Sequence, residues 1–332
     1  MRFALDALLV DVPAEQVDEA RAFYRSRRAG HGPRSPEELK EVRARRSAPR
    51  AADPPAVAET IDAAGARVPV RILTPVDGPP QGVYLDIHGG GFYLDSAAHR
   101  DERNRALADA LRLAVVSVDY RLAPEHPWPA APDDCEAAAL WLVEEAEARF
   151  GTSRLAIGGS SAGATLALAT VLRLRDRGVV DCFTGAALQF GTYDLSARTP
   201  AGRRIADEYF IQAYVGHVED RTDPDISPVY ADLRELPPTL LVIGSADVLL
   251  EDNLTMAGRL SAAGNDVEVR IYPESPHGFT GHPTAIAGTA LNDVNSWLRD
   301  RITQSQPVPR VSGGRRSPVP RGPVRRSSAP PP

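Results

Sequence analysis

Short apolar runs alternate with helical patterns through most of this chain, and this alternation limits the folds that it can adopt. Six runs have the length of buried strands: Gly82–Ile87, Ala114–Asp119, Leu155–Gly158, Ala186–Phe190, Thr239–Ile243 and Val267–Tyr272. Helical patterns accompany them at Arg103–Leu111, Asp133–Arg149, Ala162–Arg177, Asn253–Ala263 and Ala285–Arg301. Strands that are apolar on both faces and separated by helices are typical of a mostly parallel sheet with helices on both sides. The sequence therefore predicts an α/β fold, with a single domain over residues 51–301.

The first fifty residues have a different pattern. Two helices are expected, over Pro13–Arg28 and from Ser35 to about Arg46, and the second begins with a capping box that has proline at the first helical position. After a linker at Ala51–Pro55, strands at Val57–Ile61 and Val68–Leu73 predict an antiparallel hairpin. We expect residues 1–50 and the 195–225 segment to be additions above the main domain.

Charge is distributed unevenly along the 332 residues. The last 31 residues, 302–332, contain six arginines and no acidic residue. Without these six positive charges, the formal net charge changes from −6 to −12 for residues 1–301. An acidic body argues against a nucleic-acid-binding domain. The proline- and arginine-rich tail is predicted to be a disordered extension without a catalytic role. A polyanion or an SH3-like domain stays an alternative partner for it.

The composition favours a soluble cytoplasmic protein. The chain is 43% hydrophobic and 25% charged, as ordinary globular proteins are. No run approaches the roughly 18 apolar residues of a membrane span, and residues 1–12 lack the features of a signal peptide. Cys135 and Cys182 lie outside any CxxC pair, so both are expected to be reduced. The oligomeric state is left open, with a homodimer as one alternative.

Polar residues that suit catalysis follow the ends of the predicted strands. They are His88, Asp119, Ser161, Asp194, Asp247 and His277. The carboxyl ends of parallel strands meet at one edge of a sheet, and ligands bind beyond that edge. We therefore expect these side chains to be able to gather on one rim.

Ser161 is the central residue of a G-x-S-x-G motif, Gly159-Ser160-Ser161-Ala162-Gly163. The motif lies between the strand Leu155–Ile157 and a helix that continues through Ala164–Leu174. A serine at such a strand-to-helix turn is exposed to a base and to a substrate carbonyl. A turn that merely connects strand to helix is the alternative, and the neighbouring motifs argue against it. Ser161 is therefore the predicted nucleophile.

Three glycines follow His88 directly after a strand. Consecutive glycines let the backbone approach a ligand and expose N–H groups, which can stabilise the anion formed when a carbonyl is attacked. The expected donors are the amides of Gly90, Gly91 and Ala162. A phosphate-binding loop is disfavoured because the sequence has neither the lysine nor the GxGxxG pattern of such loops here. His88 is expected to brace the loop, of which Gly89 is also part.

His277 is the predicted general base. It lies in a loop after the strand Val267–Tyr272, at the carboxyl end from which a side chain can reach Ser161. His282, five residues later, is the second candidate.

Asp247 is the predicted acid that orients this histidine. It follows a strand and precedes His277, so the chain order is serine, aspartate, histidine. Asp194 also ends a strand but comes earlier, and Glu251 and Asp252 are nearby alternatives. A helix N-cap is the structural alternative for Asp247.

With these residues in place, the chain resembles the hormone-sensitive-lipase-like family of α/β-hydrolases, the bacterial family IV esterases, from about residue 60 to 300. The motifs that carry the resemblance are 88–92 (HGGGF), 119–130 (DYRLAPEHPWPA), 159–163 (GSSAG), 227–228 (SP), 247–249 (DVL) and 277–279 (HGF). The resemblance implies an α/β-hydrolase fold and a helical cap over the acyl pocket, which suits residues 1–50. The family often has an acidic residue at position 160, glycine at 164 and proline at 248, where this chain has Ser160, Ala164 and Val248.

Together, the residues and the resemblance predict a serine carboxylesterase for short- to medium-chain acyl esters. Its partner is a small-molecule ester, and neither a metal nor an organic cofactor is expected. An amidase or deacetylase of a specialised metabolite would use the same groups and stays an alternative. A non-catalytic ligand receptor is disfavoured, because the plant gibberellin receptors that resemble this family lack the catalytic histidine and His277 is present here.

Overall fold

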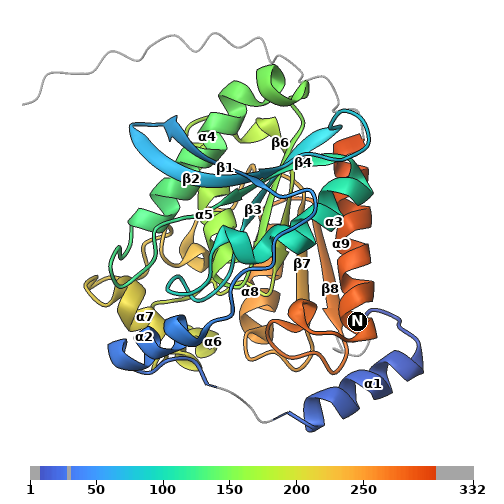
Figure 1. Cartoon of the computed structure of the whole chain (residues 1–332). Helices are drawn as coiled ribbons and strands as arrows, with labels where there is room; N and C mark the ends of the chain where they lie inside the picture. The colour runs from blue at the N-terminus through green and yellow to red at the C-terminus, as the bar shows by residue number, and fades with distance from the viewer. Residues whose placement is uncertain (1–7, 28–30, 304–332) are drawn as a thin grey trace, which may run out of the picture.

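The computed structural model describes residues 8–27 and 31–303. One sheet runs through the molecule in the strand order β1-β2-β4-β3-β5-β6-β7-β8 (Figure 1). Its strands are β1 (Val57–Ala63), β2 (Ala66–Leu73), β3 (Gly82–Ile87), β4 (Leu113–Val118), β5 (Leu155–Ser160), β6 (Phe183–Gln189), β7 (Thr239–Gly244) and β8 (Val267–Tyr272). β2 pairs antiparallel with β1 and β4, and the six strands β3 to β8 are mutually parallel. The predicted mostly parallel α/β sheet and its leading hairpin are confirmed.

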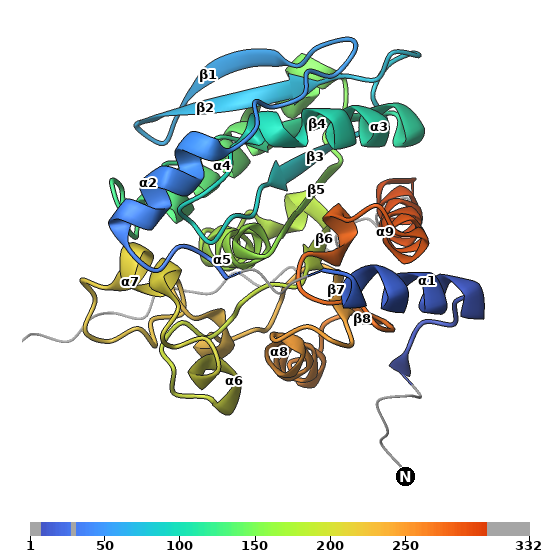
Figure 2. The same ribbon diagram turned by 60° about the horizontal axis from the view of Figure 1, so that its bottom comes forward.

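Helices connect the strands and cover both faces of the sheet (Figure 2). The α-helices are α1 (Ala14–Arg25), α2 (Pro36–Arg45), α3 (Asp101–Leu111), α4 (Ala130–Phe150), α5 (Ala162–Asp176), α6 (Pro200–Arg203), α7 (Tyr209–Val215), α8 (Leu250–Ala262) and α9 (Ala285–Thr303). Short 3-10 helices occur at Ala97–Arg100, Val180–Cys182, Pro228–Tyr230 and Phe279–Gly281. The predicted disordered tail lies outside the described residues, except for its first two positions, which extend α9.

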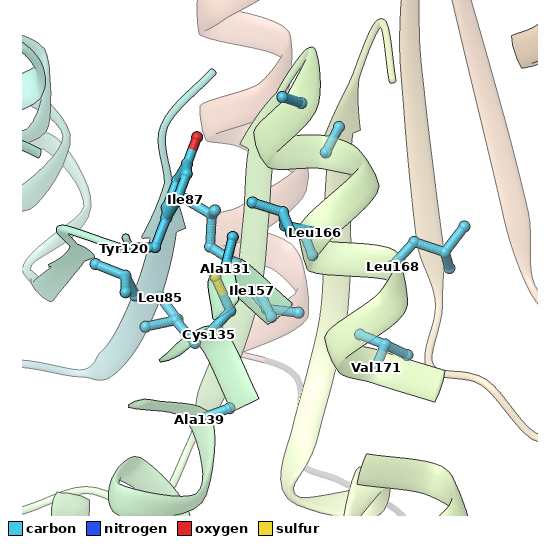
Figure 3. Packing of buried hydrophobic residues seen from close by; sticks show 14 of the residues in the cluster. Leu85, Ile87, Tyr120, Ala131, Cys135, Ala139, Ile157, Leu166, Leu168 and Val171 are labelled. Carbon is cyan, nitrogen blue, oxygen red and sulfur yellow. The ribbon is translucent and has the colours of Figure 1, made fainter. Parts of the chain in front are cut away.

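The two faces of the sheet bury separate apolar clusters. On one face, Leu85 of β3 and Ile157 of β5 pack against α4 and α5, as Figure 3 shows with Leu166 and Val171 of α5. On the other face, α3 and α9 cover residues such as Tyr84. Because neighbouring residues of a strand point to opposite faces, each central strand contributes to both clusters. This burial on both sides explains why the strands are apolar throughout.

The two N-terminal helices lie in different places (Figures 1 and 2). α1 packs against α9, where Gln16 and Thr289 form a hydrogen bond of 3.0 Å. α2 begins at the predicted cap, because the Ser35 hydroxyl accepts a hydrogen bond from the Glu38 amide. In α2, Arg43 donates to the carbonyl oxygens of the loops that follow β3 and β4. Only α2 therefore lies beside α7 and the carboxyl ends of the central strands.

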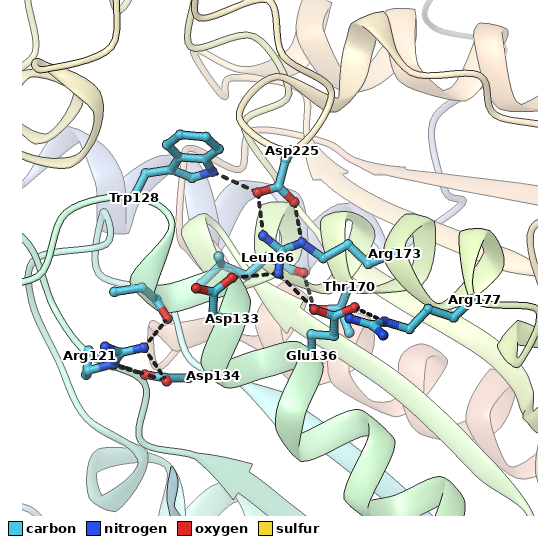
Figure 4. Close-up of polar contacts among 11 residues, drawn as sticks. Arg121, Trp128, Asp133, Asp134, Glu136, Leu166, Thr170, Arg173, Arg177 and Asp225 are labelled. Atoms are coloured by element: carbon cyan, nitrogen blue, oxygen red, sulfur yellow. Dashed lines mark hydrogen bonds and ion pairs between the residues drawn. The ribbon is translucent and has the colours of Figure 1, made fainter. Parts of the chain in front are cut away.

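Asp225 anchors the end of the 195–225 segment to the body of the domain (Figure 4). Its carboxylate accepts two hydrogen bonds from Arg173 of α5, at 2.6 and 2.7 Å, and one of 2.8 Å from the indole of Trp128. Arg173 also contacts Asp133 and Glu136 of α4, at 2.9 and 3.0 Å. The segment that carries α6 and α7 is thus held to α4 and α5 by charged hydrogen bonds.

Candidate active site

Ser161 occupies a sharp turn between β5 and α5. Its backbone has φ 53° and ψ −125°, and its amide donates to the carbonyl of Gln189 at 2.9 Å. A positive φ is costly for a non-glycine residue and is retained where the surrounding structure enforces it. Gly163 permits the turn, because a Cβ at this position would lie 2.0 Å from the carbonyl oxygen of Ile87. The turn lifts the Ser161 side chain out of the sheet edge.

The structure brings Ser161, His277 and Asp247 into one hydrogen-bonded chain. Ser161 Oγ lies 2.9 Å from His277 Nε2, and His277 Nδ1 lies 3.0 and 3.2 Å from the two carboxylate oxygens of Asp247. The Asp247 side chain is fully buried, whereas that of His277 is 36% exposed. This arrangement has the geometry of a nucleophile, a base and an orienting acid.

Asp247 is not the N-cap of α8, which was the structural alternative for this residue. The N-cap is Leu249, whose side chain makes no capping hydrogen bond. Asp247 Oδ1 accepts a hydrogen bond of 2.8 Å from the amide of Leu249, so this bond holds the carboxylate in the turn before α8.

The glycine loop after β3 presents unengaged amides to the same cavity. Gly90 has φ 102°, and a Cβ there would lie 2.2 Å from the Leu94 carbonyl oxygen, so only glycine fits. Within the described residues, no hydrogen bond uses the amide of Gly90, Gly91 or Ala162 as donor. All three residues line the cavity that contains Ser161, and the Ala162 amide lies at the positive end of α5. The predicted oxyanion donors are therefore free to bind a ligand.

His88 lies behind this loop and does not contact Ser161. Its ring stacks on Tyr120 with centroids 4.1 Å apart, and the Tyr120 hydroxyl donates to the carbonyls of His88 and Gly89 at 3.0 and 3.2 Å. Burial lowers the pKa of His88. A neutral stacked imidazole suits the bracing role expected for it.

Two other residues of the predicted rim serve neighbouring loops. Asp119 accepts a hydrogen bond of 2.9 Å from the amide of Ala97. Asp194 is fully buried and accepts hydrogen bonds from the amides and hydroxyls of Ser196 and Thr199. Their side chains hold these loops and form no hydrogen bond with His277.

The alternative base and acids are also engaged elsewhere. His282 contacts the hydroxyl of Tyr24 in α1 at 3.1 Å. Asp252 accepts from the amide of Tyr193 at 2.5 Å, and Glu251 is 3.9 Å from Arg204. Among the candidates, the structure places only His277 and Asp247 in line with Ser161.

A cavity of about 620 Å³ surrounds Ser161 and His277. Phe190 packs edge-on against the His277 ring with centroids 5.2 Å apart, and Phe210 of α7 forms another part of the wall. Val248 and Ser160, two of the departures from the family pattern, also line the cavity, whereas Ala164 is buried. The lining combines apolar side chains with polar and charged ones, three arginines included. A cavity of this size that is lined by both kinds of group suits a small-molecule ligand.

Sequence reasoning missed several residues of this wall, above all Arg103. Arg103 lines the cavity from α3, where it is half-buried and lies four residues before the buried Leu107. This spacing is the one sequence signal that points toward the core, whereas the charge of Arg103 favours a solvated face.

Two further features of the described part of the chain concern metals and membranes. In residues 8–27 and 31–303, no group of three or more His, Cys, Asp or Glu side chains is placed to hold a metal ion. No helix among these residues has the length and apolarity to span a bilayer. Cys135 and Cys182 are both free thiols.

Relatives of this chain are found by its sequence. Residues 84–281 match the model of a family described by the α/β hydrolase fold. The carboxylic ester hydrolase LipN of Mycobacterium tuberculosis H37Rv is 31% identical over 255 residues, which are 71% of this chain and 68% of LipN. The carboxylesterase NlhH of M. tuberculosis CDC 1551 is 34% identical over 239 residues, 67% of this chain and 74% of NlhH.

Solved structures show the same likeness over a larger part of the chain. The crystal structure of EstE5, soaked with p-nitrophenyl butyrate, is 26% identical with a TM-score of 0.73, covering 87% of this chain and 99% of EstE5. An esterase of Pyrobaculum calidifontis is 26% identical with a TM-score of 0.70, covering 86% of this chain and 91% of that esterase. Sequence and fold together show that this chain belongs to the α/β-hydrolase family, within its hormone-sensitive-lipase-like or bacterial family IV esterases.

Proposed function

We propose that this protein is a serine carboxylesterase that hydrolyses short- to medium-chain acyl esters with Ser161, His277 and Asp247. The observation that carries the proposal is the unbroken hydrogen-bonded chain from the Ser161 hydroxyl to the Asp247 carboxylate, at the wall of a cavity with free amides. The relatives named as carboxylic ester hydrolase and carboxylesterase support the same activity.

In the proposed mechanism, Ser161 Oγ attacks the ester carbonyl while His277 Nε2 accepts its proton. Asp247 holds the Nδ1–H tautomer and stabilises the imidazolium that forms. The amides of Gly90, Gly91 and Ala162 donate to the oxyanion of the tetrahedral intermediate. The alcohol then leaves with the proton from His277, and water activated by the same ring hydrolyses the acyl-enzyme.

The volume of the cavity fits a small acyl group, and its lining residues indicate a cap built from two separate segments. Its volume of about 620 Å³ is within the usual range for small-molecule sites, about 300–1,000 Å³. Phe210 and Ile205 of the 195–225 segment line it, as do His31 and Arg46 on either side of α2. We assign these segments to the cap, with residues 51–301 as the hydrolase domain. α1, which packs against α9, stands apart from the cavity wall.

The Ser161→Ala variant tests the proposal directly. We expect it to lose about 10⁴-fold or more of kcat for p-nitrophenyl acetate and butyrate, because no other group takes the place of the nucleophile. The control is Ser153→Ala, an exposed serine at the opposite end of β5. Both variants are compared by thermal unfolding and by labelling with a fluorophosphonate probe. To test the amidase alternative, the turnover of anilides with the same acyl groups is compared with that of the esters. Retained turnover or labelling in Ser161→Ala would remove Ser161 from the mechanism.

A further inference from the structure

The side of the cavity toward α3 is built from polar and charged groups. Asp86 of β3, Ser160 of β5 and Gln189 of β6 are the buried polar residues at or near the carboxyl ends of their strands. Each lies two or four residues after a residue of the apolar cluster that α3 and α9 cover, so its side chain points to the same face of the sheet. The three residues of that cluster are Tyr84, Ala156 and Ala187. Gln189 and Asp86 contact α3 directly, through Arg103 and Asn104. Ser160, Arg100 and Arg103 therefore place polar groups in the cavity wall beside the nucleophile. Asp86 and Gln189 are not part of the lining and contact Arg100 and Arg103, respectively.

Two of the three arginines in the cavity wall are neutralised by carboxylates. Arg100 pairs with the buried Asp86, with an N–O distance of 3.3 Å. Arg46 pairs with Asp95 at 2.7 Å. These two arginines contribute little net charge to the cavity.

Arg103, the third, has no such partner. Its one hydrogen bond goes to the side-chain oxygen of Gln189 at 3.2 Å, and the Thr280 hydroxyl donates to that same oxygen at 3.1 Å. No carboxylate in the described part of the chain forms an ion pair with Arg103. Burial, followed by the charge of Arg100, lowers the pKa of Arg103 to about 9, against the attraction of the nearby Asp86 carboxylate, which raises it. The guanidinium still carries its charge at neutral pH, and the one Asp86 carboxylate faces two arginines.

A guanidinium that is partly removed from water and not paired has a free-energy cost. It has five N–H donors in a planar fork that fits a carboxylate, and one of them is engaged here. Because Arg103 lies in the wall of the cavity that contains Ser161, a bound substrate can supply the missing anion.

We propose that Arg103 is a specificity-determining residue that binds a carboxylate on the substrate. The preferred substrates are then esters that carry a free carboxylate near the scissile bond, such as monoesters of dicarboxylic acids or acyl esters of hydroxy acids. This inference rests on the proposed esterase function, and it assigns Arg103 to substrate binding and not to the chemical step.

The experiment compares acidic esters with their neutral methyl esters. For a carboxylate on the acyl side, the pair is mono-p-nitrophenyl glutarate and its methyl ester. For the alcohol side, the pair is 4-acetoxybenzoate and methyl 4-acetoxybenzoate. The rate without enzyme is subtracted from each measured rate, because the free carboxylate of the glutarate monoester also cleaves its own ester bond. The ratio of kcat/KM for the acidic to the neutral substrate is then measured for the wild type, Arg103→Met and Arg299→Met. Arg299 is an exposed arginine of α9 and controls for overall charge.

We expect the wild type to prefer the acidic ester by at least about 10-fold in one arm, and Arg103→Met to lower that ratio by about 10- to 100-fold, as loss of a charged hydrogen bond predicts. Arg299→Met should keep the wild-type ratio. A wild-type ratio near one in both arms, or the same ratio in Arg103→Met as in the wild type, would overturn the inference. Hydrolysis of the neutral esters would still support the esterase function in that case. Hydrolysis of neither substrate class would overturn both. If Arg103→Met does not fold, competitive inhibition of the wild type by glutarate, with dimethyl glutarate as the control, decides: equal inhibition contradicts the proposal.

Discussion

Two polar networks of this molecule differ in how completely their charges are paired. The anchor network consists of Trp128, Asp133, Glu136, Arg173 and Asp225 (Figure 4). The pocket network consists of Arg103, Ser161, Gln189, Asp247 and His277. Arg173 contacts three carboxylates. Burial by itself lowers the pKa of Arg173, but the hydrogen bonds to Asp225 outweigh this effect and the pKa is raised. Arg103 contacts one neutral amide oxygen, and its pKa falls.

The pairing of a buried charge indicates its role. A charge whose hydrogen bonds are all made within the chain holds elements together, as Arg173 holds the 195–225 segment to α4 and α5. A charge or hydroxyl that lines a cavity with donors unengaged is available to a ligand. Substitutions in the anchor network should therefore change stability, and substitutions in the pocket network should change turnover or selectivity.

The largest expected effect is that of Asp247→Asn in the pocket network. Asparagine keeps the shape and can still accept from the Leu249 amide, but it no longer holds the His277 tautomer that accepts a proton from Ser161. We expect kcat to fall about 10⁴-fold, while thermal unfolding changes far less. Steady-state kinetics on p-nitrophenyl butyrate and a melting curve measure both. Asp62→Asn, an exposed aspartate of β1, is the control. A large loss of stability with turnover retained would reverse the comparison.

Much of the fold could be predicted because its signals are local. The strands at 82–87 and 267–272 have the predicted bounds, since apolar runs bounded by turns define them. β5 extends two residues beyond its prediction, to Ser160, because pairing with β6 continues into a stretch of glycine and serine that has low strand propensity. α8 begins at Leu250 and not at Asn253, because Asp247 starts the turn before it. The catalytic role of Ser161, which a local motif located, stays a prediction.

Arg103 could not be placed from the sequence in the same way. Its charge alone suggests a solvated helical face, and no motif includes it. Its place in the cavity depends on how α3 lies across the ends of β3 and β6, which is a property of the tertiary structure. The same is true of Phe210, which lines the cavity from α7, in the segment whose end Asp225 holds to α5.

The next effect in size concerns Arg173→Met in the anchor network. The substitution leaves Asp133 and Glu136 without this partner and frees most of Asp225, so we expect the free energy of unfolding to fall by about 3–5 kcal/mol. Denaturant unfolding measures this. Arg177→Met removes a more exposed partner of the same Glu136 and should cost below about 1 kcal/mol. The ratio of acidic to neutral ester turnover should stay that of the wild type, and a shift as large as that of Arg103→Met would show that the two networks are not separate.

The smallest effect tests a buried group that is partly unpaired but lies outside the cavity wall. Asp252 accepts from the Tyr193 amide through Oδ2, while its Oδ1 has no partner, and burial raises its pKa to about 7. In the unfolded chain the carboxyl titrates near 3.9, so the folded state binds the proton more tightly. Its contribution to stability is complete below about pH 4 and is lost as the pH rises to about 7. The free energy of unfolding should therefore fall by roughly 2–3 kcal/mol between pH 5 and pH 8 because of this group.

The Asp252→Asn variant tests this, because asparagine can keep the bond to Tyr193 without titrating. The pH dependence of its free energy of unfolding should be smaller by that amount, while ester selectivity stays constant. Parallel pH profiles for the two proteins would contradict the raised pKa. A changed selectivity would show that an unpaired buried group influences the substrate even from behind the wall.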